Sequence, residues 1–230
     1  MATVENHLID RLPRRDRVRL LSRCEPVPLR MGEVLYEVGH TTRFVYFPIE
    51  GFVSLLAMSD GKPALEVGMV GCEGMIGAQV ALGLATSPLH ALVQGRGTAW
   101  RISMPAFRAE LARSAALQRR LNRYMYVLIA QLAAAAACLR FHQIGPRLAR
   151  WLLMSHDRAR ADTFPVTHEF LAYMLGVRRV GVTVAAGALQ RKGLIEYRHG
   201  ELRIVDRGGL ELQACGCYAA DRAAYKDLLD

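Results

Sequence analysis

The stretch LGVRRVGVTVAAGALQRKGLIEYRHGELRI, from Leu175 to Ile204, has helical spacing but contains two glycines that a helix does not need. Gly181 and Gly187 each cost about 1 kcal/mol relative to alanine in a helix interior. Two arginines precede the first of these glycines, and a basic segment with alternating apolar residues follows the second. Helix propensity therefore does not explain the stretch, and another requirement selected these residues.

The residues in and before this stretch predict two helices joined by a tight turn. Thr167 is the expected N-cap of the first helix, and Gly176 is expected to end it in the left-handed conformation that glycine adopts without steric cost. Val177 then fills the elbow before a second helix. The inward positions of that helix are Val182, Ala185 and Leu189. This spacing of small and apolar residues predicts a helix-turn-helix.

The outward face of the second helix carries side chains that suit a DNA groove. Its main members are Arg178, Arg179, Val180, Thr183 and Val184. In a helix-turn-helix the start of the second helix enters the major groove, where arginine can bind guanine edges and valine can contact thymine methyl groups. The alternative is that the two arginines are ordinary solvated charges.

A hairpin is expected directly after the second helix. Gly193 should end that helix, and residues 194–205 alternate in polarity around an expected turn at His199–Gly200. A helix-turn-helix followed by such a hairpin is a winged helix. The candidate DNA-contacting residues are therefore Thr167, His168, Arg178, Arg179, Val180, Thr183, Val184, Arg191, Lys192, Arg198 and His199.

Charge and composition agree with a globular protein that binds a polyanion. The 230 residues are 52% apolar and 22% charged, with a net charge of +9. Between residues 140 and 207 there are twelve basic and six acidic residues, so the excess concentrates around the predicted winged helix. A basic balance favours nucleic acid or an anionic membrane as the partner.

The N-terminal part has a different pattern. Residues 5–23 predict one or two short helices with a basic, solvated face. Residues 25–102 contain short β-type segments separated by turns, which indicate a small antiparallel barrel or roll. The segments are EPVPL, VLYEV, RFVYFP, FVSLLAM, ALEVGMV, HALVQ and TAWRI, with a turn at SDGK and breaks at Gly32, Gly39, Gly51 and Gly71.

A long helical region follows from Pro105 to Phe141, with one expected break near Ser114. Apolar residues repeat in it with alternating spacings of four and three, which predicts a helical seam against a second copy of the chain. The seam residues are Leu121, Met125, Leu128, Leu132, Ala135 and Leu139. Packing against the protein's own roll is expected for the other face. The apolar run at 124–139 is shorter than the about 20 residues that a bilayer needs.

The five cysteines give no recognisable metal motif. No C-x-x-C pair occurs, and the spacing fits neither a zinc ribbon nor an iron–sulfur run. Cys215 and Cys217 form the one close pair, for which metal or redox chemistry stands against small residues on a terminal helix. We expect no metal site, reduced thiols and a cytoplasmic location.

The order of roll, long helix and VTHEFLAYMLGVRRVGVTVAAGALQRKGLI (residues 166–195) resembles the cyclic-AMP receptor and fumarate–nitrate regulator (Crp/Fnr) family of bacterial transcription factors. The resemblance implies an α+β fold with a cyclic-nucleotide-binding-like antiparallel β-roll, a dimerisation helix and a winged helix-turn-helix. The expected domains are residues 1–112, 113–141 and 142–230. The implied partners are a second copy, a palindromic double-stranded DNA operator and RNA polymerase, with no membrane.

The roll departs from the relatives that bind a cyclic nucleotide. Such relatives carry a glutamate shortly after a glycine, and then an arginine with a hydroxyl residue that hold the cyclic phosphate. Here the glycine corresponds to Gly77, the glutamate position to Ala78, and the other two positions to Leu89 and His90. A buried phosphate would lack a charged partner, so cyclic AMP is not the expected ligand.

Other cofactors of the family also lack their ligands in this sequence. The iron–sulfur branch uses an N-terminal cysteine cluster, whereas Cys24 stands alone here. A haem branch would need axial ligands, for which His40, His90 and Cys72 are isolated candidates. The sequence therefore does not identify an effector. Val180 replaces a glutamate that many relatives carry, so their base preference does not transfer.

Two other classes remain as alternatives. A cupin-like metal enzyme would need clustered histidines with a carboxylate, but His40 and His90 are widely separated and no H-x-H occurs. A winged helix that binds only protein would not explain Arg178 and Arg179 beside a basic hairpin. We therefore expect a DNA-binding regulator and not an enzyme.

Overall fold

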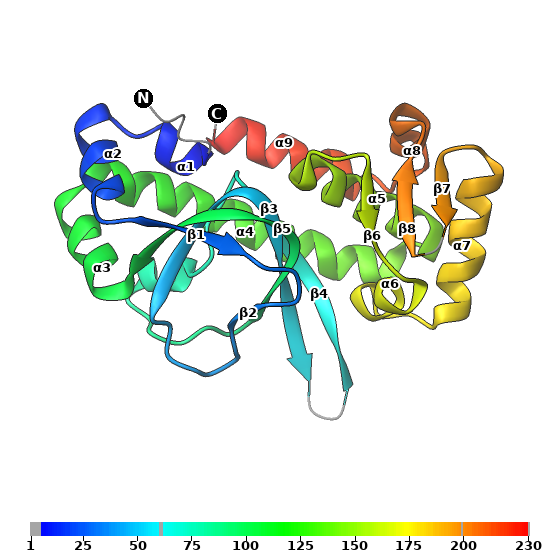
Figure 1. Cartoon of the computed structure of the whole chain (residues 1–230), viewed down its shortest axis with the longest axis horizontal. Coiled ribbons are helices and arrows are strands. Elements are labelled where there is room, and N and C mark those ends of the chain that lie inside the picture. Colours follow the sequence, from blue (N-terminus) through cyan, green and yellow to red (C-terminus); the bar gives the residue numbers. More distant parts are fainter. Residues whose placement is uncertain (1–5, 60–61, 199, 230) are drawn as a thin grey trace.

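The computed structural model describes residues 6–59, 62–198 and 200–229. A β-roll lies at one end and a winged helix at the other, and one long helix runs between them (Figure 1). Of the predicted residues, His199 and the centre of the turn at SDGK lie outside the described residues.

The roll is an antiparallel sheet in the order β1-β5-β3-β4, with β2 paired to β5. Short helices flank it on the N-terminal side, as expected. The elements are α1 (His7–Asp10), α2 (Arg14–Leu21), β1 (Glu25–Leu29), β2 (Val34–Tyr36), β3 (Phe44–Ser59), β4 (Lys62–Val70), the 3-10 helix η1 (Ala78–Leu82) and β5 (His90–Ser103).

Two pairs of predicted strands are in fact single long strands. The sequence places a break at Gly51, whereas β3 runs through it with a shift in its pairing register. Gly51 has a φ of +75°, and a Cβ there would lie 2.2 Å from the carbonyl oxygen of Gly95. The glycine is thus a bulge position that lets two backbones approach, and not a strand end. In the same way, HALVQ and TAWRI are both parts of β5.

The C-terminal half contains helices and a small three-stranded sheet in the order β6-β8-β7. Helix α9 returns from the winged helix along α4 toward the roll (Figure 1). The elements are α3 (Met104–Arg113), α4 (Ala115–Phe141), α5 (Ile144–Ala159), β6 (Thr163–Pro165), α6 (His168–Leu175), α7 (Arg179–Arg191), β7 (Ile195–Arg198), β8 (Glu201–Ile204), α8 (Arg207–Gln213) and α9 (Cys217–Leu229).

Helix α4 begins where the sequence predicts a break. The Ser114 hydroxyl accepts a hydrogen bond from the Leu117 amide at 3.1 Å and so caps the helix. In length and composition α4 could cross a membrane, and the bent α6–α7 pair also passes that test if it is counted as one span. The core helix of a soluble protein passes the same test, and one side of α4 packs on the roll.

The face of α4 that packs on the roll includes part of the predicted dimer seam. Leu121 is fully buried and Ala135 is 5% exposed, so both belong to the core of one protomer, and their assignment to a second helix is corrected. The fully buried Tyr124 fixes this face by donating a hydrogen bond to the carbonyl of Met75. Tyr126 and Ile129, by contrast, are 64% and 65% exposed. The apolar face left uncovered is therefore rotated from the predicted seam.

The roll and the winged helix share one hydrophobic core cluster. Phe52, Leu56 and Met69 of the roll pack in the same cluster as residues of α5, α6 and α7. The β3–β4 hairpin also contacts the turn of the helix-turn-helix, since a Cβ on Gly176 would lie 2.6 Å from the Leu65 side chain. The division at residue 142 stays a prediction, because this core extends across it.

Candidate nucleic-acid interface

The helix-turn-helix has the geometry that the sequence predicts. Thr167 caps α6 by accepting a hydrogen bond from the Phe170 amide at 3.1 Å. Gly176 ends α6 with a φ of +62°, and α7 then leaves at an angle of 110°. The predicted inward residues of α7, namely Val182, Ala185 and Leu189, are all buried.

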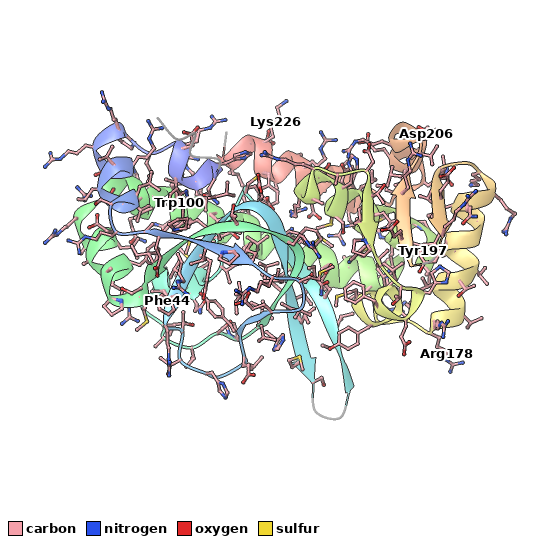
Figure 2. All side chains as sticks on the ribbon, in the orientation of Figure 1. Phe44, Trp100, Arg178, Tyr197, Asp206 and Lys226 are labelled. Atoms are coloured by element: carbon pink, nitrogen blue, oxygen red, sulfur yellow. The ribbon has the colours of Figure 1, made fainter. Side chains whose placement is uncertain are left out.

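The outward face of α7 is open to solvent. Arg178 is the N-cap of α7, and Arg179 is its first residue. Both are exposed, as is Thr183, and the valines at 180 and 184 are each 66% exposed. Figure 2 shows Arg178 at the lower edge of this lobe, pointing away from the protein. The first half of α7 thus presents cationic and apolar groups side by side.

The two glycines of α7 have different surroundings. A Cβ on Gly181 would lie 2.7 Å from Cδ1 of Ile144, so this glycine allows α7 to pass close to α5. Gly187 meets only the side chain of Arg191 at 3.4 Å, which is ordinary contact. Close packing against α5 therefore accounts for Gly181, and nothing in the fold explains Gly187.

The wing lies next to the start of α6. The Val166 amide donates a hydrogen bond to the carbonyl of Gly200 at the wing tip, at 2.8 Å. The Tyr197 hydroxyl donates to the carbonyl of Val166, also at 2.8 Å. His168 stacks on the Tyr197 ring with centroids 4.5 Å apart. Thr167, His168 and the exposed Arg198 are thus gathered near the wing tip.

His168 also joins the wing to α7. Its Nδ1 lies 3.1 Å from the hydroxyl oxygen of Thr183, which in turn donates to the carbonyl of Arg179. Since that hydroxyl has one proton, His168 donates from Nδ1 and is held in one tautomer. Burial and the nearby Arg179 charge lower the pKa of His168, so the imidazole is neutral near pH 7. The histidine therefore orients α6, α7 and the wing relative to one another.

Two predicted contacts lie elsewhere. Arg191 and Lys192 are at the far end of α7, about 18 Å from Arg179 at 1.5 Å per residue. The Lys192 ammonium also lies 2.5 Å from the side-chain oxygen of Gln213 in α8. The structure therefore does not bring these two residues together with the others.

The charge excess around the winged helix is partly structural. At least four of the twelve basic residues are tied to partners within the chain. Arg150 pairs with Asp221 at 2.6 Å and Arg158 with Glu73 at 2.7 Å. Arg207 pairs with Asp157, and Arg147 donates to the carbonyl of Leu175. The net charge of +6 thus overstates the charge available to a partner.

Sequence reasoning missed these internal arginines, although a signal was present. At 100° per residue, positions 147, 150 and 158 lie on the same face of α5 as Trp151 and Met154. A face that mixes arginine with large apolar side chains is typical of a packed helix with internal ion pairs. The net charge alone indicates a basic binding surface, because a count of charges does not distinguish the faces of a helix.

The residues that correspond to an effector site are packed against other side chains. Gly77 has a φ of +97°, and a Cβ there would lie 2.5 Å from the hydroxyl of Tyr36. That hydroxyl donates to the carbonyl of Phe44, and the Tyr36 ring is buried. Ala78 belongs to one core cluster, whereas Leu89 packs against another and His90 is half-buried.

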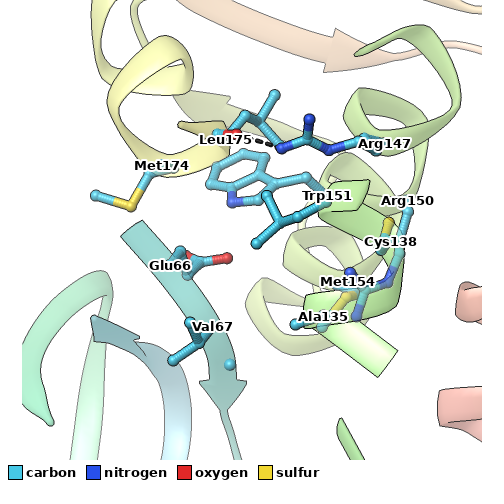
Figure 3. Close-up of a pocket in the computed structure, with 12 residues that line it drawn as sticks. Glu66, Val67, Ala135, Cys138, Arg147, Arg150, Trp151, Met154, Met174 and Leu175 are labelled. Carbon is cyan, nitrogen blue, oxygen red and sulfur yellow. Dashed lines mark hydrogen bonds between the residues drawn. The ribbon is translucent and has the colours of Figure 1, made fainter. Parts of the chain in front are cut away.

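Three cavities in the described part of the chain have other linings. The largest, about 750 Å3, lies between α5, α9 and residues near Cys72. A second, about 340 Å3, is lined by β2 and the residues that follow it. A third, about 40 Å3, lies between β4, α4, α5 and α6 and includes Glu66 and Cys138 (Figure 3). None of these is lined by Gly77, Ala78, Leu89 or His90.

The structure also gathers a set of residues that the sequence did not connect. The side-chain donor atoms of Cys138, His142, Cys215 and Cys217 all lie within 4.8 Å of one another. The sequence predicts no metal site, because the cysteine spacing matches no metal-binding motif. Cys138 and Cys215 are 77 positions apart in the chain. Only the return of α9 along α4 brings them together.

Comparison with known proteins agrees with this architecture. Residues 146–212 match the family model of the Crp-like helix-turn-helix domain. A putative transcriptional regulator of the Crp/Fnr family from Eubacterium rectale is similar in structure, with a TM-score of 0.70 and 16% identity over 91% of this chain and 99% of that one. No curated protein sequence matches the chain.

Two further solved structures have the same fold. The c-di-GMP responsive global regulator CLP from Xanthomonas campestris has a TM-score of 0.67 and 18% identity, over 84% of this chain and 99% of that one. FixK2 from Bradyrhizobium japonicum has a TM-score of 0.68 and 14% identity, over 84% and 98%.

The chain thus carries a winged helix behind a β-roll, and α7 presents an exposed face in that winged helix. Residues 146–212 form a Crp-like helix-turn-helix domain, and the roll and long helix complete the fold of the Crp/Fnr regulators.

Proposed function

We propose that the protein binds a palindromic DNA operator as a homodimer, with α7 of each protomer in the major groove. The observation that carries the proposal is the open first half of α7. Among the residues that the structure describes, neither Arg178 nor Arg179 has an ion-pair partner, whereas Arg150 and Arg158 of α5 do. Two valines beside them are two-thirds exposed. This mixture fits guanine edges, phosphates and thymine methyl groups.

The wing and the start of α6 supply the phosphate contacts in this proposal. Thr167 and the neutral His168 lie beside the wing, where Arg198 is exposed. Hydroxyl, imidazole and guanidinium groups commonly bind the DNA backbone and fix the register of the recognition helix. Arg191 and Lys192, at the other end of α7, have at most a peripheral part.

The dimer forms through α4 in this proposal. The uncovered face is apolar around Tyr126 and Ile129, and the predicted seam residues Met125, Leu128 and Leu132 are only half-buried beside it. Leu139 is half-buried near the end of the same helix. An apolar face of this kind on a long helix is typical of a helix–helix interface. A dimer would set two α7 helices one DNA turn apart, about 10–10.5 bp between half-site centres.

The roll does not use cyclic AMP in this proposal. Tyr36 packs against Gly77, and Ala78 and Leu89 pack in apolar clusters, so none of these three positions offers a charged partner to a cyclic phosphate. Leaving that charge unpaired would cost several kcal/mol. Millimolar cyclic AMP or cyclic GMP should leave the melting temperature unchanged, whereas a ligand at one hundred times its Kd would stabilise the fold by about 2.7 kcal/mol. Because a similar structure is titled as c-di-GMP responsive, that dinucleotide belongs in the same melting series.

The decisive experiment measures DNA affinity as a function of salt. A duplex selected from a random pool is titrated with the purified protein, with a scrambled duplex as the control. If the dimer neutralises about 6–10 phosphates, log affinity should fall with log salt at a slope of about −5 to −9. A slope near zero, or equal binding of the two duplexes, would contradict the proposal. We propose further that the protein acts in the cytoplasm, contacts RNA polymerase and has no catalytic activity.

A further inference from the structure

A cluster of three cysteines and a histidine lies where the winged helix meets the long helix. Cys138 is in the last turn of α4, and His142 is the C-cap of that helix. Cys215 lies in the loop between α8 and α9, and Cys217 is the first residue of α9. One donor atom from each residue lies within 4.8 Å of all the others.

The spacing of the donor atoms fits a single tetrahedral ion. The Sγ atoms of Cys138 and Cys215 are 3.5 Å apart, and Sγ of Cys217 lies 3.7 Å from Nδ1 of His142. In a tetrahedral zinc site with Zn–S of about 2.3 Å and Zn–N of about 2.0–2.1 Å, neighbouring donors are about 3.5–3.8 Å apart. Both measured edges fall in that range.

The donor set also selects the kind of ion. Three thiolates and one imidazole form a soft set of the Cys3His type, which zinc prefers and which calcium and magnesium do not. No carboxylate belongs to the cluster. A polynuclear cluster would need its ligands spread around several metal atoms, whereas these four donors converge on one point.

The surroundings suit a buried anionic centre. Zinc with three thiolates has a net charge of −1, which needs a cationic neighbour when it is buried. Arg147 and Arg150 line the small cavity beside Cys138 (Figure 3). Arg150 Nε is buried without a hydrogen-bond partner in the described part of the chain. Its guanidinium already pairs with Asp221 of α9, so the same arginine links the cluster to that helix.

Two of the four residues are partly exposed, which leaves a route for the ion to enter from solvent. Cys138 and Cys215 are 2% and 8% exposed, whereas His142 and Cys217 are half-buried and reach the surface. Such a site would be closed on one side by protein and would admit an ion from the other. A closed set of four protein ligands is typical of structural zinc and not of catalytic zinc, which keeps an open position.

We propose that Cys138, His142, Cys215 and Cys217 bind one zinc-class ion, which ties the α8–α9 loop to the end of α4. Helix α5 begins two residues after His142, and the Cys215 amide donates to the carbonyl of Pro146 in the first turn of α5. The ion therefore spans the junction where the winged helix leaves the dimer helix. Zinc binding releases the protons of the coordinating thiols, so its affinity falls at low pH.

The test uses the full-length protein, purified under reducing conditions. After removal of metal with a chelator, zinc is added, and the bound metal is measured by mass spectrometry of the intact protein and by elemental analysis. Cobalt(II) is then used as a probe, because a tetrahedral thiolate site gives it intense visible absorption. We expect one ion per chain and the tetrahedral cobalt spectrum.

Variants identify the ligands. Cys215→Ser and His142→Asn should each weaken zinc binding by more than about 100-fold, since loss of even outer-shell partners costs about 10–100-fold. Cys24→Ser, a half-buried cysteine of the roll outside the cluster, is the matched control and should bind zinc like the wild type. Circular dichroism checks that each variant is folded. If Cys215→Ser unfolds, His142→Asn still tests the site, because His142 is only half-buried and its replacement should leave the fold intact.

Three results would overturn the proposal. They are a wild-type protein that binds no zinc tighter than micromolar, a cobalt spectrum without thiolate bands, and zinc binding that survives in both ligand variants. Failure of the proposed function is separate, because these measurements use no DNA. An effect of zinc on operator affinity rests on the proposed function and is measured afterwards with the same duplex.

Discussion

The arginines of α5 and those at the start of α7 are the same kind of side chain within one lobe, but they do opposite things. The side chains of Arg150 and Arg158 are only 12% and 8% exposed, and they pair with carboxylates from α9 and from the roll. Arg178 and Arg179 face solvent, with valines beside them that are two-thirds exposed. The comparison teaches that an excess of basic residues indicates a polyanionic partner only when the residues in internal ion pairs are left out of the count.

The largest expected effect is the loss of a buried pair. Arg158→Ala leaves the Glu73 carboxylate, which is 16% exposed, without its guanidinium. Removing one partner of a buried ion pair costs about 3–5 kcal/mol, so the free energy of unfolding should fall by that amount. Urea denaturation measures it. The double variant Arg158→Ala with Glu73→Ala should recover part of the loss, and an equal or larger loss would contradict the pairing.

The comparison extends to the apolar residues on the two faces of α4. Leu121→Ala removes a fully buried side chain and should cost about 2–5 kcal/mol of folding stability without changing the oligomeric state. Ile129→Glu should leave the folding stability of one protomer unchanged, because Ile129 is 65% exposed there. It should instead disrupt the dimer, in which a second helix would bury the new charge.

Sedimentation velocity distinguishes the two outcomes for α4. Ile129→Glu should give monomers that retain their circular dichroism spectrum, and Val18→Glu, at an exposed apolar position on α2, is the control that should leave the dimer intact. An Ile129→Glu protein that sediments as the wild type would show that the uncovered face is not the interface.

On α7 the expected effect is on binding and not on stability. Arg179→Ala should cost about 1–3 kcal/mol of operator affinity if Arg179 reads a guanine, and should change the free energy of unfolding by less than about 0.5 kcal/mol. Arg30→Ala, an exposed arginine on the roll, is the matched control and should change neither quantity. If Arg179→Ala weakens all duplexes equally, Arg179 contacts a phosphate and not a base.

The smallest effect concerns a half-buried acid, Glu66. Burial raises the pKa of Glu66 to about 7, although its carboxylate accepts a hydrogen bond from Ser54. The pKa in the unfolded chain is about 4.5, so between about pH 4.5 and pH 7 the unfolded state loses a proton that the folded state keeps, and stability falls as pH rises.

Glu66→Gln removes this pH dependence. Relative to the wild type, the variant should gain on the order of 1–2 kcal/mol of stability between about pH 5 and pH 8. The measurement is urea denaturation at several pH values. Glu50→Gln, on an exposed part of the neighbouring strand β3, should follow the wild type. Parallel curves for Glu66→Gln and the wild type would contradict the raised pKa.

Local signals in the sequence were enough to predict the winged helix. A cap at Thr167, a left-handed glycine at 176 and an inward face at Val182 lie within sixteen residues, and each acts on its own helix or turn. The long helix and its break at Ser114 were predicted for the same reason. Local pattern decides local structure, so these elements did not depend on knowing the rest of the fold.

Features set by distant parts of the chain were not predictable. Gly51 reads as a strand end because the backbone of Gly95, which it must approach, is 44 residues away. Which face of α4 stays uncovered depends on where the roll packs against the helix. The spacing of apolar residues in the sequence does not contain that information. The cysteine and histidine cluster depends on α9 returning along α4. In each case the missing information was a contact between elements.

The core cluster shared by the roll and the winged helix sets a threshold for signalling. Each large apolar side chain that leaves such a core loses about 1.5–3 kcal/mol. Phe52, Leu56 and Met69 all contribute to it, so a change that separates the two lobes is opposed by at least about 5 kcal/mol. Offsetting a bias of that size, so that the two arrangements become about equally populated, requires a ligand that binds one arrangement on the order of 10,000-fold more tightly than the other. An effector of this protein must therefore be highly selective between states, and a weakly bound metabolite would leave α7 where the core holds it.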